Sequence, residues 1–305
     1  MNIIPMEPAY GRSHPNARLF AMFILLMLIF VAIGWIIGAV FFGDWITGSL
    51  IFLLLAGVLN LVSYLFSDKI VLWSYRAKIV SENDAPRLYR IVRYVAGLNS
   101  LPMPRVAIVP SRTPNAFATG RKPEKAVVAA TEGILELLND NELSGVIAHE
   151  MAHVKDRDVL VMTVAATVAG AIAFMARMFV WNMFLGGSGR KQGNGDFLIA
   201  ILVAITAPIA ALAVQLAISR SREYKADFQG ARTIGKPAYL ADALEKLEVA
   251  NKRRPMQRGN PASSSIFIVN PFRGSSFFTL FSTHPPIEKR VRRLRDMASG
   301  KIQMY

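Results

Sequence analysis

The 305-residue sequence contains no cysteine and only four histidines. The lack of cysteine excludes disulfides, thiolate metal sites and cysteine nucleophiles, so any bound metal must be held by His, Asp or Glu. Charged residues are also scarce, at 18% against about 25% in an ordinary soluble domain. Apolar residues nevertheless reach 53%, and Lys and Arg outnumber Asp and Glu by 35 to 21. An apolar excess and a basic excess cannot share one surface, so the composition indicates an integral membrane protein with separate apolar and basic segments.

Four apolar segments are long enough to cross a bilayer as helices. The predicted spans are residues 19–42, 45–66, 159–185 and 197–218. We interpret the first as a retained signal anchor, because it is longer than the apolar region of a signal peptide and no small-x-small cleavage site follows it. Arg177 lies within the third span. It either marks a buried polar cavity or, as its position near Trp181 favours, reaches the far interface.

Basic residues lie almost entirely on one side of the predicted spans. Of the 35 Lys and Arg, two precede the first span, 13 lie between the second and third, and 17 follow the fourth. The positive-inside rule therefore predicts that the N-terminus and both large polar segments are cytoplasmic. The predicted parts are an N-terminal arm with the first transmembrane hairpin (1–66), the first part of a cytoplasmic domain (67–158), a second hairpin (159–218) and the second part of that domain (219–305).

Short-range patterns predict the elements of the cytoplasmic domain. Residues 84–98 place apolar side chains at helical spacing and end near a Gly-Leu-Asn stop signal. Residues 105–109 and 126–130 are short runs with β-branched residues, bounded by Pro, Gly and charges, which is typical of strands. The stretch 255–283, rich in Pro, Gly and Ser, predicts a loop over the domain, and a helical pattern resumes at 287–297.

The most informative motif lies on a predicted helix that begins after Asn139. Asn139 and Glu142 form the pattern of a capping box. His149 and His153, in the sequence His-Glu-Met-Ala-His, project from one helical face and can both bind one Zn²⁺. Glu150 between them is placed to take a proton from zinc-bound water. The structural alternative is a pair of packed or exposed histidines without a metal.

A catalytic zinc of this kind needs a third protein ligand. A third histidine further along the motif is excluded, because Asp156 and Val159 stand where that arrangement requires Gly and His. Glu223 is the predicted ligand on an argument of depth. It follows the fourth span by five residues, and His153 precedes the third by six residues, about 9 Å of helix. Antiparallel spans would bring the two residues to one height.

Asp227 lies four residues after Glu223 and therefore on the same helical face. Metal-bound histidines usually donate their second ring N–H to a carboxylate or a carbonyl, so Asp227 is predicted to accept this bond from His149. The alternative for both carboxylates is an ordinary charged helix surface just outside a membrane.

Four motifs occur along the chain: His149-Glu-Met-Ala-His153, Ser219-Arg-x-x-Glu223-x-x-Ala-Asp227, Asn115-Ala-Phe-Ala and Phe281-Ser-Thr-His-Pro-Pro-Ile-Glu-Lys-Arg. With four spans placed as above, they closely resemble the HtpX family of bacterial membrane metalloproteases, which is related to the CAAX prenyl endopeptidases. The resemblance implies a zinc-dependent endopeptidase with one Zn²⁺ per chain. It implies a bacterial inner-membrane location, a cytoplasmic active site, and a role in quality control of misfolded or damaged membrane proteins under stress.

The expected fold is a mainly α integral membrane protein with four transmembrane helices and a cytoplasmic α+β catalytic domain of the zincin (gluzincin) type. Two further residues are candidates for its active site. His284 could donate to the oxyanion formed during attack on a peptide carbonyl, or it could be a structural histidine that caps the last helix. Asn115 and the residues after it could form an edge strand that pairs with extended substrate, or a plain loop-to-strand junction.

The expected partners are membrane or unfolded protein substrates, with an ATP-dependent membrane protease of the same pathway as a further candidate. For the basic runs 252–254 and 289–295, anionic lipid headgroups are a simpler partner than nucleic acid, which we do not expect. Two other classes of function stay open. A non-proteolytic adaptor with a structural zinc site would have no use for Glu150, and a transporter would need more ionisable groups within the spans than Arg177.

Overall fold

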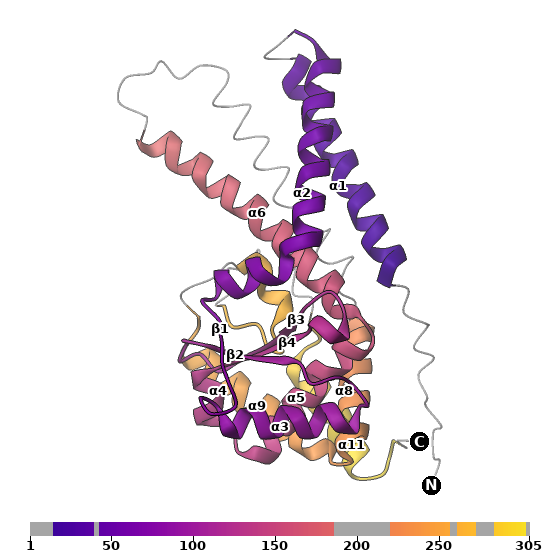
Figure 1. The fold of residues 1–305 in the computed structure, drawn as a ribbon, viewed down its shortest axis with the longest axis vertical. Helices are drawn as coiled ribbons and strands as arrows, with labels where there is room; N and C mark the ends of the chain where they lie inside the picture. Colours follow the sequence, from indigo (N-terminus) through magenta and orange to yellow (C-terminus); the bar gives the residue numbers. More distant parts are fainter. Residues whose placement is uncertain (1–14, 40–42, 186–219, 257–260, 273–283, 303–305) are drawn as a thin grey trace.

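Three long helices project from one side of a body that contains the sheet (Figure 1). They are α1 (Pro15–Ile37), α2 (Trp45–Ser74) and α6 (Asp158–Leu185). The computed structural model describes residues 15–39, 43–185, 220–256, 261–272 and 284–302, and the side chains of 172–185 are not included. In this part of the chain, the helical stretches Asn16–Ile36 and Trp45–Ser74 are long and apolar enough to cross a membrane.

The first two predicted spans are confirmed as membrane-competent helices, with different ends. Helix α1 begins four residues before the predicted start, and α2 continues eight residues beyond residue 66. The extension contains the charged residues Asp68 and Lys69, which limit the apolar run but do not interrupt the helix. Helix α2 ends shortly before Arg76, which adopts a left-handed conformation with φ of 53°. The third span corresponds to α6, of which Asp158–Ala171 forms an apolar helix. The span 197–218 and the side chain of Arg177 lie outside the described residues, so the count of four stays a prediction.

Glycines join α1 to α2 at short range. A Cβ atom on Gly48 would lie 2.3 Å from the carbonyl oxygen of Gly34 and 2.4 Å from the Cα of Gly38. Helix backbones approach this closely only where small residues face each other, a common way of packing helices in membranes. Asp44 precedes α2, and its carboxylate accepts hydrogen bonds from the first turn, the nearer at 2.9 Å. The predicted tight hairpin is therefore confirmed.

A four-stranded mixed sheet with the order β1-β2-β4-β3 forms the centre of the body. Its strands are β1 (Lys78–Ile79), β2 (Arg105–Val109), β3 (Ala116–Thr119) and β4 (Val127–Thr131). Strands β2 and β4 are parallel, and β1 and β3 join them antiparallel at the two edges. The predicted strand 105–109 is confirmed in full and the strand 126–130 with a shift of one residue. The edge strand suggested for the residues after Asn115 is confirmed as β3, whereas β1 was not predicted because it has only two residues.

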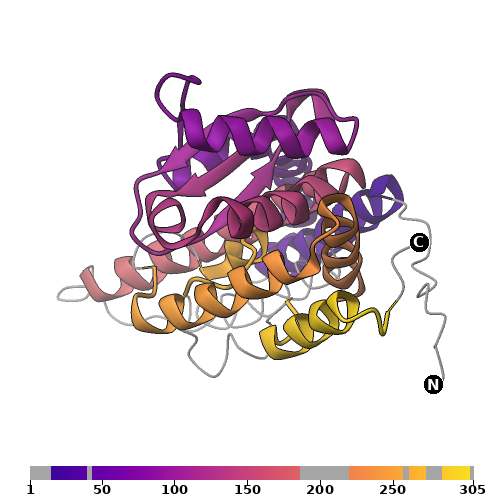
Figure 2. The ribbon, with the colours of Figure 1, turned by 90° about the horizontal axis from the view of Figure 1, so that it is seen from below.

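Helices surround this sheet. The remaining elements are α3 (Pro86–Leu98), η2 (Pro123–Lys125), α4 (Glu132–Leu137), α5 (Asp140–Lys155), α8 (Arg220–Ile234), α9 (Pro237–Arg253), η3 (Pro261–Ile266) and α11 (Ile287–Ala298). Helices α3, α5 and α11 confirm the predicted helical segments. In Figure 2 the orange α9 and the yellow α11 lie side by side, and α9 also packs against α5. The predicted domain boundaries are not tested by this arrangement and stay predictions.

The two faces of the sheet belong to different cores. Val106, Ala118 and Val128 pack with apolar residues of α3, α5, α9 and α11. Their neighbours in sequence point to the other face, where Phe117 meets Tyr75, at the end of α2, and Phe267. Alternation along each strand therefore buries the sheet on both sides, with residues of α5 in the core on one face and residues of α2 and α6 in the core on the other.

The prediction that residues 255–283 form a loop over the domain is wrong in part. It contains η3, and residues 266–269 are buried in the two cores. The backbone N–H of Ile268 donates to the carbonyl of Ala116 at 3.2 Å, so this segment is attached to β3. The apolar run Ile-Phe-Ile-Val at 266–269 was the signal in the sequence. Residues 257–260 and 273–283 lie outside the described part of the chain.

A sharp break separates the motif helix from the third predicted span. Helix α5 ends at Lys155 and α6 begins at Asp158, and Arg157 between them has φ of 57°. We predicted a continuous helix from His153 to Val159 when we compared the depths of the ligands, and this prediction is wrong. Helix α6 nevertheless starts within a few residues of the motif, so the motif and the third predicted span remain close.

We expect Gly48→Ala to destabilise the α1–α2 hairpin, by about 1–3 kcal/mol, because the new methyl group would overlap backbone atoms that can move only if the helices separate. Thermal unfolding in detergent, followed by tryptophan fluorescence, measures the change. Gly57→Ala is the matched control, since a Cβ there meets no atom within 4 Å in the described structure. Equal midpoints for the two variants would contradict the proposed contact.

Candidate metal centre

Helix α5 holds the two histidines of the motif in the interior of the body. Its first turn is fixed by the predicted capping box: the Asn139 side chain accepts the Glu142 backbone N–H at 2.9 Å, and the Glu142 carboxylate accepts the Asn139 backbone N–H at 3.1 Å. His149, Glu150 and His153 lie in the second half of the helix, and none is more than 3% exposed. Their polar atoms therefore face other protein groups rather than solvent.

Glu223 reaches this point from the first turn of α8. Its carboxylate oxygens lie 3.4 Å from Nε2 of His153 and 3.8 Å from Nε2 of His149. One nitrogen or oxygen from each of the three residues lies within 4.8 Å of the others, so together they could hold one metal ion. Helix α8 comes this near because Gly230 faces α5, where a Cβ atom would lie 2.8 Å from the backbone nitrogen of His149. The structure thus brings together all three predicted ligands.

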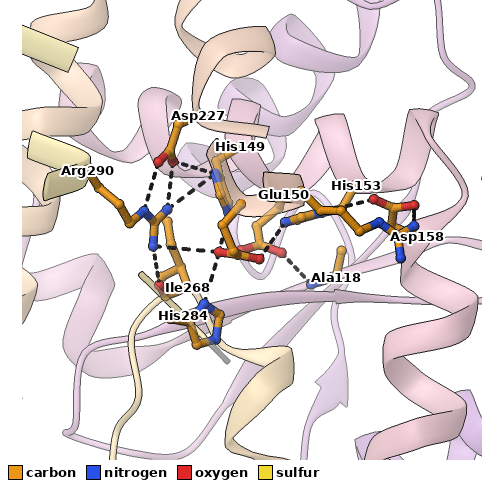
Figure 3. A network of polar contacts seen from close by, with 11 residues as sticks. Ala118, His149, Glu150, His153, Asp158, Asp227, Ile268, His284 and Arg290 are labelled. Atoms are coloured by element: carbon orange, nitrogen blue, oxygen red, sulfur yellow. Dashed lines mark hydrogen bonds and ion pairs between the residues drawn. The ribbon is translucent and has the colours of Figure 1, made fainter. Parts of the chain in front are cut away.

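Asp227 lies one turn after Glu223 and takes the predicted position beside His149. Its Oδ1 is 2.9 Å from Nδ1 of His149. Arg290 of α11 holds the same carboxylate from the other side, with Nε and Nη2 donating at 2.8 and 2.7 Å (Figure 3). A third N–H of Arg290 donates to the carbonyl of Ile268 at 2.8 Å. This fork of bonds fixes the carboxylate that in turn orients the His149 ring.

These contacts set the protonation states around His149. Burial by itself would raise the pKa of Asp227, but the charge of Arg290 and the hydrogen bonds from His149 and Arg290 outweigh it and lower the pKa to about 2. Burial lowers the pKa of His149 to about 4; the Arg290 charge adds to this effect, and Asp227 opposes it. His149 is therefore neutral at pH 7, which is the state in which an imidazole binds a metal.

His153 faces a second carboxylate that was not predicted. Oδ2 of Asp158, the first residue of α6, lies 3.8 Å from Nδ1 of His153, and Asp158 forms an ion pair with Arg222 of α8. Burial lowers the pKa of His153, but the nearby carboxylate of Glu223 outweighs it and raises the pKa. The sequence signals were the position of Asp158 five residues after His153 and that of Arg222 directly before Glu223.

Glu150 points toward the edge strand. Its Oε2 accepts the backbone N–H of Ala118 in β3 at 2.9 Å (Figure 3). Burial raises the pKa of Glu150 to about 8, with the charge of His153 as the largest opposing influence. A carboxyl group with such a pKa can accept and return a proton near neutral pH. This behaviour fits the predicted role of general base.

His284 lies in the site, directly before α11. Its Nδ1 is 2.9 Å from Oε2 of Glu223, and its Nε2 is buried without a hydrogen-bond partner among the described residues. The N-cap residue of α11 is Pro286, which makes no side-chain cap hydrogen bond in the described structure, and the recorded bond of the His284 side chain goes to Glu223 instead. The predicted role of His284 as an oxyanion donor is compatible with this position and stays a prediction.

Asn115 is buried just before β3. Its side-chain amide donates to the carbonyl of Val269 at 2.6 Å, and its backbone N–H donates to the Thr131 hydroxyl at 2.8 Å. The first bond attaches the segment 261–272 to the start of the edge strand, and the second attaches Asn115 to the end of β4, which gives Asn115 a structural role. A contact between Asn115 and substrate stays a prediction.

Arg290 corrects part of the prediction for the basic run 289–295. We assigned that run to lipid headgroups, but the Arg290 side chain is fully buried in the site. The signal was helical periodicity, because Arg290, Leu294 and Met297 form the buried face of α11. A basic residue on the apolar face of an amphipathic helix indicates a buried ion pair rather than a surface charge.

Peptidase family M48 matches residues 82–298, a stretch that includes every side chain of the site described above. The chain belongs to peptidase family M48. The class of enzyme predicted from the motifs is therefore confirmed.

Curated relatives of this M48 peptidase carry the name Protease HtpX homolog, which confirms the resemblance stated from the motifs. The protein from Thermococcus sibiricus is 53% identical over 273 residues, which cover 88% of this chain and 91% of that protein. The one from Syntrophobacter fumaroxidans is 51% identical over 281 residues, 91% of this chain and 99% of that protein. Among solved structures, the crystal structure of S. mikatae Ste24p is similar over 91% of this chain and 67% of its own, with 17% identity and a TM-score of 0.46.

We expect Arg290→Met to destabilise this M48 peptidase by about 3–5 kcal/mol, because the carboxylate of Asp227 would stay buried without its counter-charge. The double variant Asp227→Asn/Arg290→Met removes both charges and should recover most of the loss. Chemical unfolding of the metal-free proteins measures both changes. A double variant as unstable as the single one would show that the ion pair is not the reason.

Acid should weaken the metal-free fold through Asp227. Its pKa is lowered on folding, so its stabilising contribution is present above the pKa of an unfolded Asp, about 3.9, and is lost as the pH falls toward about 2. Comparison of unfolding free energies at pH 6 and pH 3 measures this dependence. Wild type should lose about 1–2 kcal/mol more than Asp227→Asn over that range, and equal losses would contradict the assignment.

Proposed function

We propose that this M48 peptidase is a zinc-dependent membrane endopeptidase that cleaves misfolded or damaged membrane proteins at the cytoplasmic face. The observation that carries the proposal is the convergence of His149, His153 and Glu223, with Glu150 beside them, inside a body attached to two membrane-competent helices. The names of the relatives, Protease HtpX homolog, support proteolysis as the activity.

The residues present fit a divalent cation. Nε2 of His153 and Oε1 of Glu223 are buried and have no hydrogen-bond partner among the described residues, so each offers a free lone pair. Around them, four buried carboxyl groups face two guanidinium groups. If every carboxyl is ionised, two negative charges remain, which one dication neutralises. Two imidazoles and one carboxylate form a ligand set that zinc prefers in hydrolytic sites.

When bound, a Zn²⁺ ion supplies Lewis-acid activation of water and of the peptide carbonyl. Glu150 accepts a proton from the attacking water and passes it to the nitrogen of the leaving amine. The N–H of Ala118 holds Glu150 at the edge of β3, the edge on which an extended peptide would lie. In its protonated form, His284 carries an N–H on both ring nitrogens. Nδ1–H then bonds to Glu223, and Nε2–H donates to the carbonyl oxygen as that oxygen becomes negative.

Four spans with the N-terminus and the active site in the cytoplasm are part of this proposal. The distribution of Lys and Arg supports that orientation. The short distance in sequence from His153 to α6 supports cleavage near the membrane surface, where loops of membrane proteins and unfolded chains are accessible. A bacterial inner-membrane location and a pathway shared with an ATP-dependent membrane protease belong to the same proposal.

Anionic lipid headgroups are the proposed membrane partner, at a cavity of about 590 Å³ beside the end of α2. Arg76, Arg112, Arg253 and Arg254 line it. No ion pair involving these four arginines is recorded within the described ranges, whereas Arg295 in the run 289–295 pairs with Asp242 and Glu245. Within the run 252–254, Lys252 pairs with Glu248, so Arg253 and Arg254 are the proposed contacts for phosphate groups of the bilayer.

We expect Glu150→Gln to retain about one zinc per chain but to cleave casein or an unfolded membrane client at least about 100-fold more slowly, because the amide cannot accept the proton. Metal analysis and a cleavage assay, with and without chelator, measure both properties. Glu124→Gln is the control, since Glu124 is exposed in η2. Retained cleavage by Glu150→Gln would refute the mechanism. Zinc and client binding by the wild type without any cleavage would instead favour the adaptor.

A further inference from the structure

Each motif histidine faces a carboxylate that is paired with an arginine. At His149 the pair is Asp227 and Arg290, and at His153 it is Asp158 and Arg222. Figure 3 shows Asp227 and Asp158 at opposite ends of the site, each next to its own histidine. The first pair joins α8 to α11 and follows the usual arrangement around a metal-bound histidine. The second pair joins α6 to α8.

The second pair is also buried. Asp158 is 2% exposed and Arg222 7%, although each carries a charge. Removing two charged groups from water costs free energy, and the attraction between them often does not offset this cost. A buried ion pair therefore suggests a specific role for the two residues. Asp158 Oδ2 faces Nδ1 of His153 at 3.8 Å, whereas Nε2 of the same ring faces Glu223 at 3.4 Å. The carboxylate therefore lies on the side of the ring opposite the ligand atom.

The position of Asp158 affects which ring nitrogen of His153 carries the proton. An imidazole can bind a metal through Nε2 only when its remaining proton is on Nδ1. At 3.8 Å the Asp158 carboxylate is too far from Nδ1 for a hydrogen bond, but its negative charge on that side of the ring favours the tautomer with the proton on Nδ1. Arg222 holds the carboxylate in place and compensates its charge, as Arg290 does for Asp227.

We infer that Asp158, held by Arg222, is the positioning residue for His153 and raises the metal affinity of the site. This inference rests on the proposed metal site and adds a residue to it. Asp158 is also the first residue of α6, and Arg222 directly precedes Glu223 in α8. The pair thus links a predicted membrane helix to two ligands at once, so a shift of α6 relative to α8 would change the metal site.

A neighbouring ion pair supplies a matched control. Lys225 of α8 and Asp156, in the break between α5 and α6, lie 2.7 Å apart, and both are partly exposed. This pair lies at the same junction, but no contact of Asp156 with a metal ligand is recorded in the described structure. Asp156→Asn therefore removes an ion pair from the same place without removing a carboxylate from a ligand histidine.

The experiment compares zinc dissociation constants of the full chain in detergent, by competition with a chromophoric chelator. We expect Asp158→Asn to weaken zinc binding about 10- to 100-fold, as is typical of such outer partners, and Arg222→Gln to weaken it less. Asp227→Asn should weaken binding by a similar factor, and Asp156→Asn by less than about threefold. Circular dichroism of the metal-free proteins shows which variants are folded.

The outcomes separate the inference from the proposed function. Wild-type affinity in folded Asp158→Asn, or an equal loss in Asp156→Asn, would overturn the positioning role. If Asp158→Asn does not fold, the variant Asp158→Glu tests the positioning role instead. It retains the ion pair but changes the carboxylate position, so a folded protein with unchanged zinc affinity would overturn the role. A wild-type protein that binds no zinc would contradict the proposed function itself.

Discussion

The burial of acidic groups around α5 is the constraint on which the rest of the structure depends. Four carboxyl groups meet in the interior, and each must have a partner because an uncompensated charge is costly there. Histidines, arginines and one backbone N–H of β3 supply these partners. The groups come from five elements, so the site forms only when the chain has folded as a whole. With all four carboxyl groups ionised, two negative charges are left beyond the two arginines, and a divalent cation would balance them. This connects the stability of the body to its proposed chemistry.

Close packing of helices makes this arrangement possible. Gly230 lets α8 lie against α5, so Glu223 and Asp227, one turn apart, both face the histidines. Helix α11 completes the site, because its buried face presents Arg290 to Asp227. The chain also turns sharply after α5, and this turn places the start of α6 beside the site. The start of α6 and the candidate metal site are therefore parts of one packed unit at this junction.

Local patterns were informative where one element decides the outcome. The capping box, the His-Glu-x-x-His motif and the strand 105–109 depend on spacing within a few residues, and all were predicted in place. Glu223 was also identified, but by a depth argument that assumed a continuous helix through residues 156–158. The selection succeeded because Glu223 and the motif both lie within a turn or two of an apolar segment, a property that survives the break.

The sequence by itself determined the chemistry available: no thiols, a histidine pair on one helical face, a nearby carboxylate, and apolar helices long enough for a membrane. These are properties of composition and of helical periodicity, which act over short distances. Only the tertiary structure decided how the charges are balanced. Arg290 is 141 residues from His149 and 63 from Asp227 in the sequence. From the sequence we predicted it as a surface charge, and only the packing of α11 shows that it is buried. Compensation of buried charge depends on which helices and strands meet in space. The spacing of residues within one helix or strand cannot predict those contacts.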